Sequence, residues 1–157
     1  MKNFSAELTN ALESDCAHSM EPLMKGKRSE DFDDLVELLA EDVGESNMKV
    51  KALYALGRWG DTKAVTAIGK FLPSFNESER VTAVDALGRL GSAPALNSVI
   101  SLKEDPSSNV RKFVVKALSR FNKPKADKEL KFIQENDKEP FVRDYATKLS
   151  LKAAKNK

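Results

Sequence analysis

The sequence predicts an all-α protein, a right-handed α–α superhelix in which antiparallel helix pairs stack as a solenoid. The first observation is a phrase, ALGRWGD over residues 55–61, that returns as ALGRLGS over 86–92 and in weaker form as ALSRFNK over 117–123. A period of 31 residues is typical of solenoids, whose units pack only on their neighbours. The second observation is apolar spacing of three, four and seven residues, which places side chains on one face of a helix. No segment shows the alternation of a half-buried strand.

The first helix of each pair is predicted from columns of residues that repeat in register. Equivalent positions in the four units are counted from a basic residue, which is Lys49, Arg80, Arg111 or Arg143. Alanine follows three positions later, alanine follows at six and leucine follows at seven, each in three of the four units. Small residues let neighbouring helices approach closely, and the leucine fills the space between them.

Each first helix is expected to end at a corner, after which the second helix begins. Two corners carry glycine, which tolerates the left-handed backbone that often ends a helix. Pro94 and Pro124 stand where the next helix should begin, and proline suits a first turn. The second helices, near residues 63–72, 94–102 and 124–133, each carry one apolar and one polar stripe.

The ends depart from the repeat, as capping units do. We expect one domain over 1–157, with an atypical helical cap over 1–28, repeats over 29–152 and a frayed tail over 153–157. Within the cap, residues 3–20 place apolar side chains at four-residue steps, which predicts one amphipathic helix with Cys16 in its apolar stripe.

Composition limits the class of protein. A single cysteine cannot form an internal disulfide, which favours a reducing, cytoplasmic setting. No run of 18 apolar residues exists, so no transmembrane helix is expected. Residues 1–48 carry 12 acidic and 4 basic side chains, whereas residues 103–157 carry 8 and 15. Because chain order is spatial order in a solenoid, the array should have an acidic and a basic end, which serve either in steering partners or only in solubility.

The columns resemble the HEAT-like repeats of the phycobilisome-lyase family, whose consensus runs Asp-Pro-x-x-x-Val-Arg and then Ala-x-x-Ala-Leu-Gly. Residues 105–111, DPSSNVR, match it closely, and residues 137–143, DKEPFVR, match with the proline displaced. The resemblance covers residues 29–152 and implies a hydrogen-bonded ladder between successive repeats. On the matching positions, that ladder would use Asp105, Arg111, Asp137 and Arg143. Lys49 and Arg80 keep the charge without an aspartate six residues earlier.

The sequence gives little support for a catalytic site or a metal site. Cys16 and His18 lie two residues apart, and such residues do not face each other on a helix. One histidine and one cysteine cannot complete a zinc site, and the chain lacks the repeated His-Glu pairs of di-iron enzymes built on this repeat. We therefore predict a protein that is not an enzyme and needs no cofactor.

Two further features have both a structural and a functional interpretation. Arg58, Arg89 and Arg120 recur near the ends of the first helices; they either satisfy helix C-termini or form a row of cations for an acidic ligand. Trp59 shares a column with Leu90 and Phe121, which favours packing over an exposed contact.

The polar stripe of the second helices is the predicted binding surface, and we expect it to line the concave side. Concave solenoid surfaces often bind extended partners. Its residues are Lys63, Thr66, Lys70, Asn97, Ser101, Lys125, Lys128 and Lys131. We predict a scaffold or adaptor that binds an acidic or polar segment of a protein here. The alternatives are an accessory protein or subunit of a bilin lyase, as the resemblance implies, and a nucleic-acid contact through the basic C-terminal half.

Overall fold

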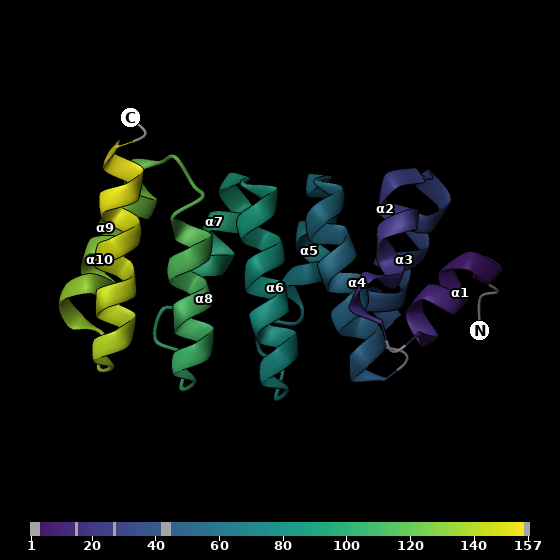
Figure 1. Ribbon diagram of the computed structural model, residues 1–157, viewed down its shortest axis with the longest axis horizontal. Coiled ribbons are helices and arrows are strands. Elements are labelled where there is room, and N and C mark those ends of the chain that lie inside the picture. The colour runs from purple at the N-terminus through teal and green to yellow at the C-terminus, as the bar shows by residue number, and fades with distance from the viewer. Residues whose placement is uncertain (1–3, 15, 27, 42–44, 156–157) are drawn as a thin grey trace.

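The computed structural model describes residues 4–14, 16–26, 28–41 and 45–155, and it shows a superhelix of helices stacked in chain order (Figure 1). The described residues contain no strand, which confirms the all-α prediction. A first layer runs through the array: α4 (Ser46–Trp59), α6 (Glu77–Leu90), α8 (Ser108–Leu118) and α10 (Pro140–Lys155). A second layer lies behind it in Figure 1: α3 (Ser29–Glu41), α5 (Val65–Gly69) with the preceding 3₁₀ turn η2 (Thr62–Ala64), α7 (Ala93–Ile100) and α9 (Pro124–Asn136). The helix α10 extends to Lys155, into the tail that was expected to fray.

Short polar side chains begin several of these helices. The Asn76 side chain accepts hydrogen bonds from the amides of Ser78 and Glu79. The Ser92 and Ser107 hydroxyls each accept a hydrogen bond from the amide of the residue three positions later. Such bonds satisfy amides that have no partner within the first turn of a helix. Glycine ends α4 and α6, because Gly60 and Gly91 adopt φ angles of 85° and 66°.

The first layer is held together by very close contacts between small residues. A Cβ atom on Gly57 would lie 2.6 Å from both the Cα and the Cβ of Ala86. One repeat later, a Cβ atom on Gly88 would lie 2.6 Å from the Cβ of Ala117. The small columns read from the sequence therefore lie in matching positions where one helix packs on the next, within one continuous apolar core.

The N-terminal cap differs from the prediction of one helix over residues 3–20. It consists of α1 (Ala6–Glu13), the 3₁₀ turn η1 (Ala17–Met20) and α2 (Glu21–Gly26), and Figure 1 shows α1 at the N-terminal end of the array. Leu8, Leu12 and Met20 are buried, but Cys16 is exposed and does not belong to the apolar stripe. The reason is that α1 ends at Glu13 and Ser14 is extended, which breaks the helical register before Cys16 is reached.

A buried lysine attaches the cap to the repeats. Only 6% of Lys51 is exposed, and its ammonium group donates hydrogen bonds to the carbonyl oxygens of Leu12 (2.8 Å), Ala11 (3.3 Å) and Ser14. These are carbonyls at the C-terminal end of α1, where a helix leaves acceptors without internal partners and a cation is favourable.

Candidate partner-binding surface

The structure places the eight predicted binding residues on one layer, all exposed to solvent; we call them the second-helix face. Lys63 and Thr66 come from η2 and α5, and Lys70 directly follows α5. Asn97 lies on α7 and Ser101 follows its last residue. Three lysines line the exposed side of α9, at positions 125, 128 and 131. The polar stripe that the sequence indicates is therefore a real surface feature.

Contacts within the second-helix face leave much of its positive charge unpaired. The ammonium group of Lys125 donates a hydrogen bond of 2.7 Å to the side-chain oxygen of Asn97, which bridges α9 and α7. The ammonium nitrogen of Lys131 lies 4.0 Å from a carboxylate oxygen of Glu135, and an exposed pair of this kind contributes little to stability. Within the described part of the chain, the ammonium groups of Lys63 and Lys128 have no hydrogen bond or ion pair, so they can contact a partner without losing an internal bond.

The curvature of the array does not support the predicted concave position of this face. The helices of the first layer contact one another extensively, from α4 through α6 to α8. The second-layer helices α5 and α7 contact each other far less. A stack whose two layers differ in spacing curves toward the closer layer, so the first layer is favoured as the concave side. The second-helix face is defined by its exposure and charge.

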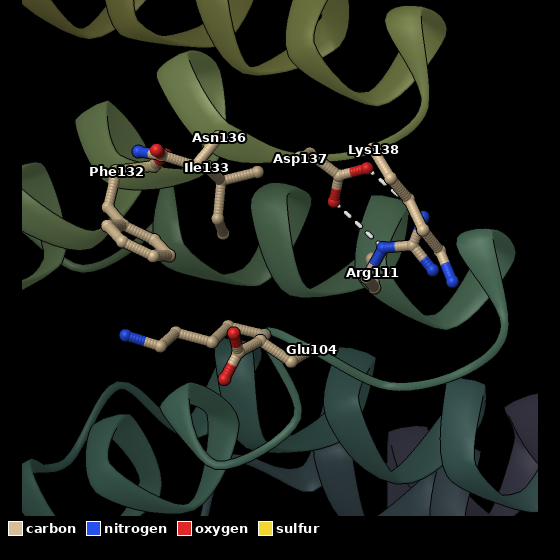
Figure 2. Close-up of a pocket in the computed structure, with 8 residues that line it drawn as sticks. Glu104, Arg111, Phe132, Ile133, Asn136, Asp137 and Lys138 are labelled. Carbon is tan, nitrogen blue, oxygen red and sulfur yellow. Dashed lines mark hydrogen bonds and ion pairs between the residues drawn. The ribbon is translucent and has the colours of Figure 1, made fainter.

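A pocket of about 240 Å³ opens beside α9, at the turn that leads from α7 to α8 (Figure 2). Phe132 lines it and is 41% exposed, so its ring is open to a ligand. The ammonium group of Lys103 lies 4.3 Å from the centre of the Phe132 ring and 2.8 Å from a carboxylate oxygen of Glu129. The pocket thus joins an apolar anchor to polar groups directly beside Lys128 and Lys131, the combination typical of binding sites.

The back of this pocket is a buried ion pair, visible in Figure 2. The guanidinium group of Arg111 donates to the Asp137 carboxylate with N–O distances of 2.8 and 3.1 Å. It also donates to the main-chain oxygen of Asp105, at 2.9 Å. Burial alone would raise the pKa of Asp137, but the hydrogen bonds from Arg111 and from the Glu139 amide outweigh it and hold that pKa below its usual value. The pair links the turn before α10 to α8 and forms part of the pocket wall.

The same ladder extends further toward the N-terminus than the resemblance implied. Asp105 pairs with Arg80 of the preceding repeat, at 2.9 and 3.1 Å, and not with Arg111. Arg143 donates to the main-chain oxygen of Asp137 at 2.5 Å. Each arginine therefore binds the main chain of the turn before its own helix, and Arg80 and Arg111 also reach the aspartate of the next repeat.

A serine replaces the aspartate where the ladder ends. Ser74 occupies the position 31 residues before Asp105, and its hydroxyl oxygen accepts the Asn76 amide as Asp105 accepts the Ser107 amide. The buried carboxylate of Glu79 then accepts hydrogen bonds of 2.6 Å from both Ser74 and Ser46. Neutral donors thus serve here in place of an arginine pair.

Sequence reasoning gave no site role to Phe132, Lys103 or Asn136, which line the pocket. Phe132 breaks the polar stripe of α9 next to Lys131, and an aromatic side chain within a lysine stripe is the signal that could have indicated the pocket. Lys103 and Asn136 belong to turns and helix ends, where periodicity carries no information about contacts.

Catalytic and metal sites do not emerge from the described residues. Cys16 and His18 are both exposed, and no group of three or more histidine, cysteine or carboxylate side chains gathers as it would around a metal ion in the described ranges. None of the helices in those ranges is both long and apolar enough to span a bilayer.

Comparisons with known proteins agree with the architecture. Residues 66–149 match a family model described as HEAT repeats. Among solved structures, the chain resembles one chain of the complex of CpcE and CpcF of phycocyanin lyase from Nostoc sp. PCC7120, with a TM-score of 0.68, 15% identity, and coverage of 93% of this chain and 99% of that one. It also resembles computationally designed armadillo repeat proteins for modular peptide recognition, with a TM-score of 0.56, 18% identity, and coverage of 93% and 80%. The comparison with curated proteins found no match. At these identities the structural likeness concerns the fold alone.

Proposed function

Because the chain belongs to the HEAT-repeat family, we propose that it is a non-enzymatic scaffold that binds an acidic or polar segment of a protein partner through the second-helix face. The observation that carries this proposal is the exposed lysine stripe of α9 beside the Phe132 pocket. Repeat scaffolds bind by presenting a preformed surface, so little order has to be gained when a partner arrives.

The chemistry of the face defines the partner. Its side chains are lysines, amides and hydroxyls, which attract carboxylates and donate hydrogen bonds. The half-exposed Phe132 ring provides an apolar surface with the Lys103 ammonium over one face, which suits an apolar residue of the partner flanked by acidic ones. The stripe is wide enough for an extended segment because it crosses η2, α5, α7 and α9.

The experiment combines partner capture with charge reversal. The tagged protein is used to recover partners from native lysate, beside a variant with Lys63→Glu, Lys70→Glu, Lys128→Glu and Lys131→Glu. We expect the variant to lose the partner while its melting temperature stays within a few degrees, because all four side chains are exposed. Unchanged recovery would contradict the assignment of the face.

A matched pair of variants separates the pocket from general charge. Phe132→Ala removes the apolar anchor and keeps every lysine, whereas Phe141→Ala removes an equally exposed phenylalanine outside the pocket. Loss of the partner with the first variant alone would identify the pocket as part of the surface.

The second candidate is a role beside a bilin lyase, supported by the coverage of 93% and 99% in the likeness to the CpcE–CpcF structure. A titration with a linear tetrapyrrole tests it, because a bound pigment shifts its visible absorbance. We rank this candidate below the scaffold, since HEAT repeats in general serve binding and this likeness extends only to fold.

A further inference from the structure

The exposed side of the first layer carries its own repeated pattern, separate from the second-helix face. One column consists of Tyr54, Asp85 and Lys116, and a second consists of Arg58, Arg89 and Arg120, each at steps of 31 residues. We call these two columns the first-helix face. Both lie on α4 and α6 and on α8 with its C-terminal end, in the layer that the helix spacing favours as the concave side.

The arginine column is not explained by helix capping. The amides of Gly60 and Gly91 already donate to the carbonyl oxygens of Leu56 and Leu87 at the ends of α4 and α6. Arg89 donates instead to the Asp85 carboxylate at 2.9 Å, and Arg120 donates to the other oxygen of the same carboxylate at 2.9 Å. Arg89 and Arg120 thus bind a carboxylate on this face and not the carbonyl groups at a helix end.

Positive charge on this face exceeds the negative charge available to it. Asp85 accepts from Arg89, Arg120 and also Lys116, whose ammonium group lies 3.1 Å away. In the repeat before, Tyr54 stands where Asp85 stands, so Arg58 lacks the equivalent carboxylate. The two columns thus hold four cations and one carboxylate, and three of the four cations contact that carboxylate.

Aromatic rings contact two of these four cations. The guanidinium carbon of Arg58 lies 5.5 Å from the centre of the Tyr54 ring, and the Lys116 ammonium lies 4.9 Å from that of Phe113. Such contacts restrict a long side chain and leave its outer donors open to solvent. A preformed set of cations binds an anion with a smaller loss of side-chain entropy.

Glycines lie between the arginines, and two of them, Gly60 and Gly91, are exposed. Gly57, Gly60, Gly88 and Gly91 line a shallow depression of about 500 Å³ together with the three arginines. Nothing lies within 4 Å of the positions where Gly60 and Gly91 would carry a side chain. The main chain of a ligand can therefore approach closely between the guanidinium groups.

We propose that the first-helix face is a second binding surface, which takes an extended acidic segment of a protein. The depression crosses three repeats, so it fits a chain with several carboxylates better than a single ion. Single-stranded nucleic acid is disfavoured, because it needs open aromatic faces for stacking and Tyr54 lies under Arg58. The proposal does not depend on the second-helix face, since the two surfaces share no residue.

Fluorescence anisotropy with a labelled decapeptide of alternating glutamate and glycine tests this proposal on the full chain. We expect saturable binding at 50 mM NaCl that weakens at 500 mM, because salt screens exposed charges. Arg58→Glu with Arg89→Glu should weaken binding at least about tenfold, whereas Arg58→Lys with Arg89→Lys should weaken it less because the charge is kept. The matched control, Lys25→Glu with Lys123→Glu, makes the same change of charge at exposed lysines outside both faces and should leave the affinity unchanged.

Three results would overturn the proposal. The first is no saturable binding of the peptide. The second is equal binding of a glutamine–glycine peptide of the same length. The third is weakening by the lysine control variant as strong as that caused by the arginine variant. Tighter binding of a 20-nucleotide single-stranded RNA, lost with the arginine variant, would reassign the surface to nucleic acid. Circular dichroism of each variant separates lost binding from lost folding.

Discussion

Gly57 packs against Ala86 so closely that a Cβ atom on the glycine would lie 2.6 Å from the Cα and Cβ of the alanine. One of these two atoms, the Cα of Ala86, belongs to the backbone and cannot rotate away as a flexible side chain can. Gly88 and Ala117 repeat the arrangement one unit later. The distance between neighbouring first helices is thus set by the absence of a single methyl group.

Substitution of this glycine tests the packing. Gly57→Ala should lower the free energy of unfolding by about 1–3 kcal/mol or more, because α4 and α6 must move apart. Gly69→Ala is the matched control: it has open space at the same position, and there alanine should be neutral or slightly stabilising. Urea denaturation followed by circular dichroism measures both, and equal effects of the two substitutions would contradict the close packing.

The attachment of the cap by Lys51 gives a second prediction. Lys51→Met keeps the aliphatic stem and removes the ammonium group, which leaves carbonyl groups at the end of α1 without their donor. We expect a loss of about 1–3 kcal/mol in the free energy of unfolding. Hydrogen exchange should show faster exchange of α1 amides than in the native protein, with exchange in α8 unchanged. Lys63→Met, at an exposed lysine, is the control, and protection of α1 that survives Lys51→Met would show that the apolar contacts alone hold the cap.

The buried ladder gives a third prediction. Arg111→Met leaves the Asp137 carboxylate buried without its partner and should cost about 3–5 kcal/mol. The exposed pair of Lys131 and Glu135 is the comparison, and Lys131→Met should cost less than about 1 kcal/mol. A double-mutant cycle with Asp137→Asn would measure the coupling of Arg111 and Asp137 directly. A coupling near zero would mean that the pair adds little beyond its packing.

The pH dependence of stability follows from the depressed pKa of Asp137. The unfolded chain binds a proton at this aspartate near its ordinary pKa of about 3.9, whereas the folded chain binds it only at lower pH. The contribution to stability is therefore complete above the unfolded pKa and is lost as pH falls through the folded one. Urea denaturation at several values between about pH 6 and pH 2 should show this decline, and Arg111→Met should flatten it. An unchanged slope in the variant would exclude Arg111 as the cause.

The repeated residue columns predicted the fold, because the spacing of residues along the sequence already determines which side chains occupy matching positions in successive helices. The alanines at 55, 86 and 117 are all buried where one first helix meets the next. Cys16 was misplaced because the break after Glu13 depends on Ser14 adopting an extended backbone, and no proline or glycine marks it. Lys51 gave no signal of burial, since its acceptors lie about 40 positions earlier in the chain.

The ladder and the binding surfaces show where sequence reasoning stopped. Arg80 was set aside because no aspartate precedes it, yet it pairs with Asp105, 25 positions later. Such a pair depends on the superhelical stacking and not on a motif within one repeat. Likewise, the exposure of Lys128 follows from helical periodicity, but which layer is concave depends on the relative spacing of the two layers.

Because the Gly–Ala contact and the arginine–aspartate bond both repeat, a chain of this kind can be lengthened by whole repeat units. Residues 80–110 contain the bonded pair Arg80 and Asp105, and they contain one half of each of two Gly–Ala contacts: Ala86, which accepts Gly57, and Gly88, which packs on Ala117. A tandem duplication of this segment would join surfaces that already fit, so the array could gain a unit without a new core. Insertion of only part of a unit would put the copied glycine out of line with its alanine.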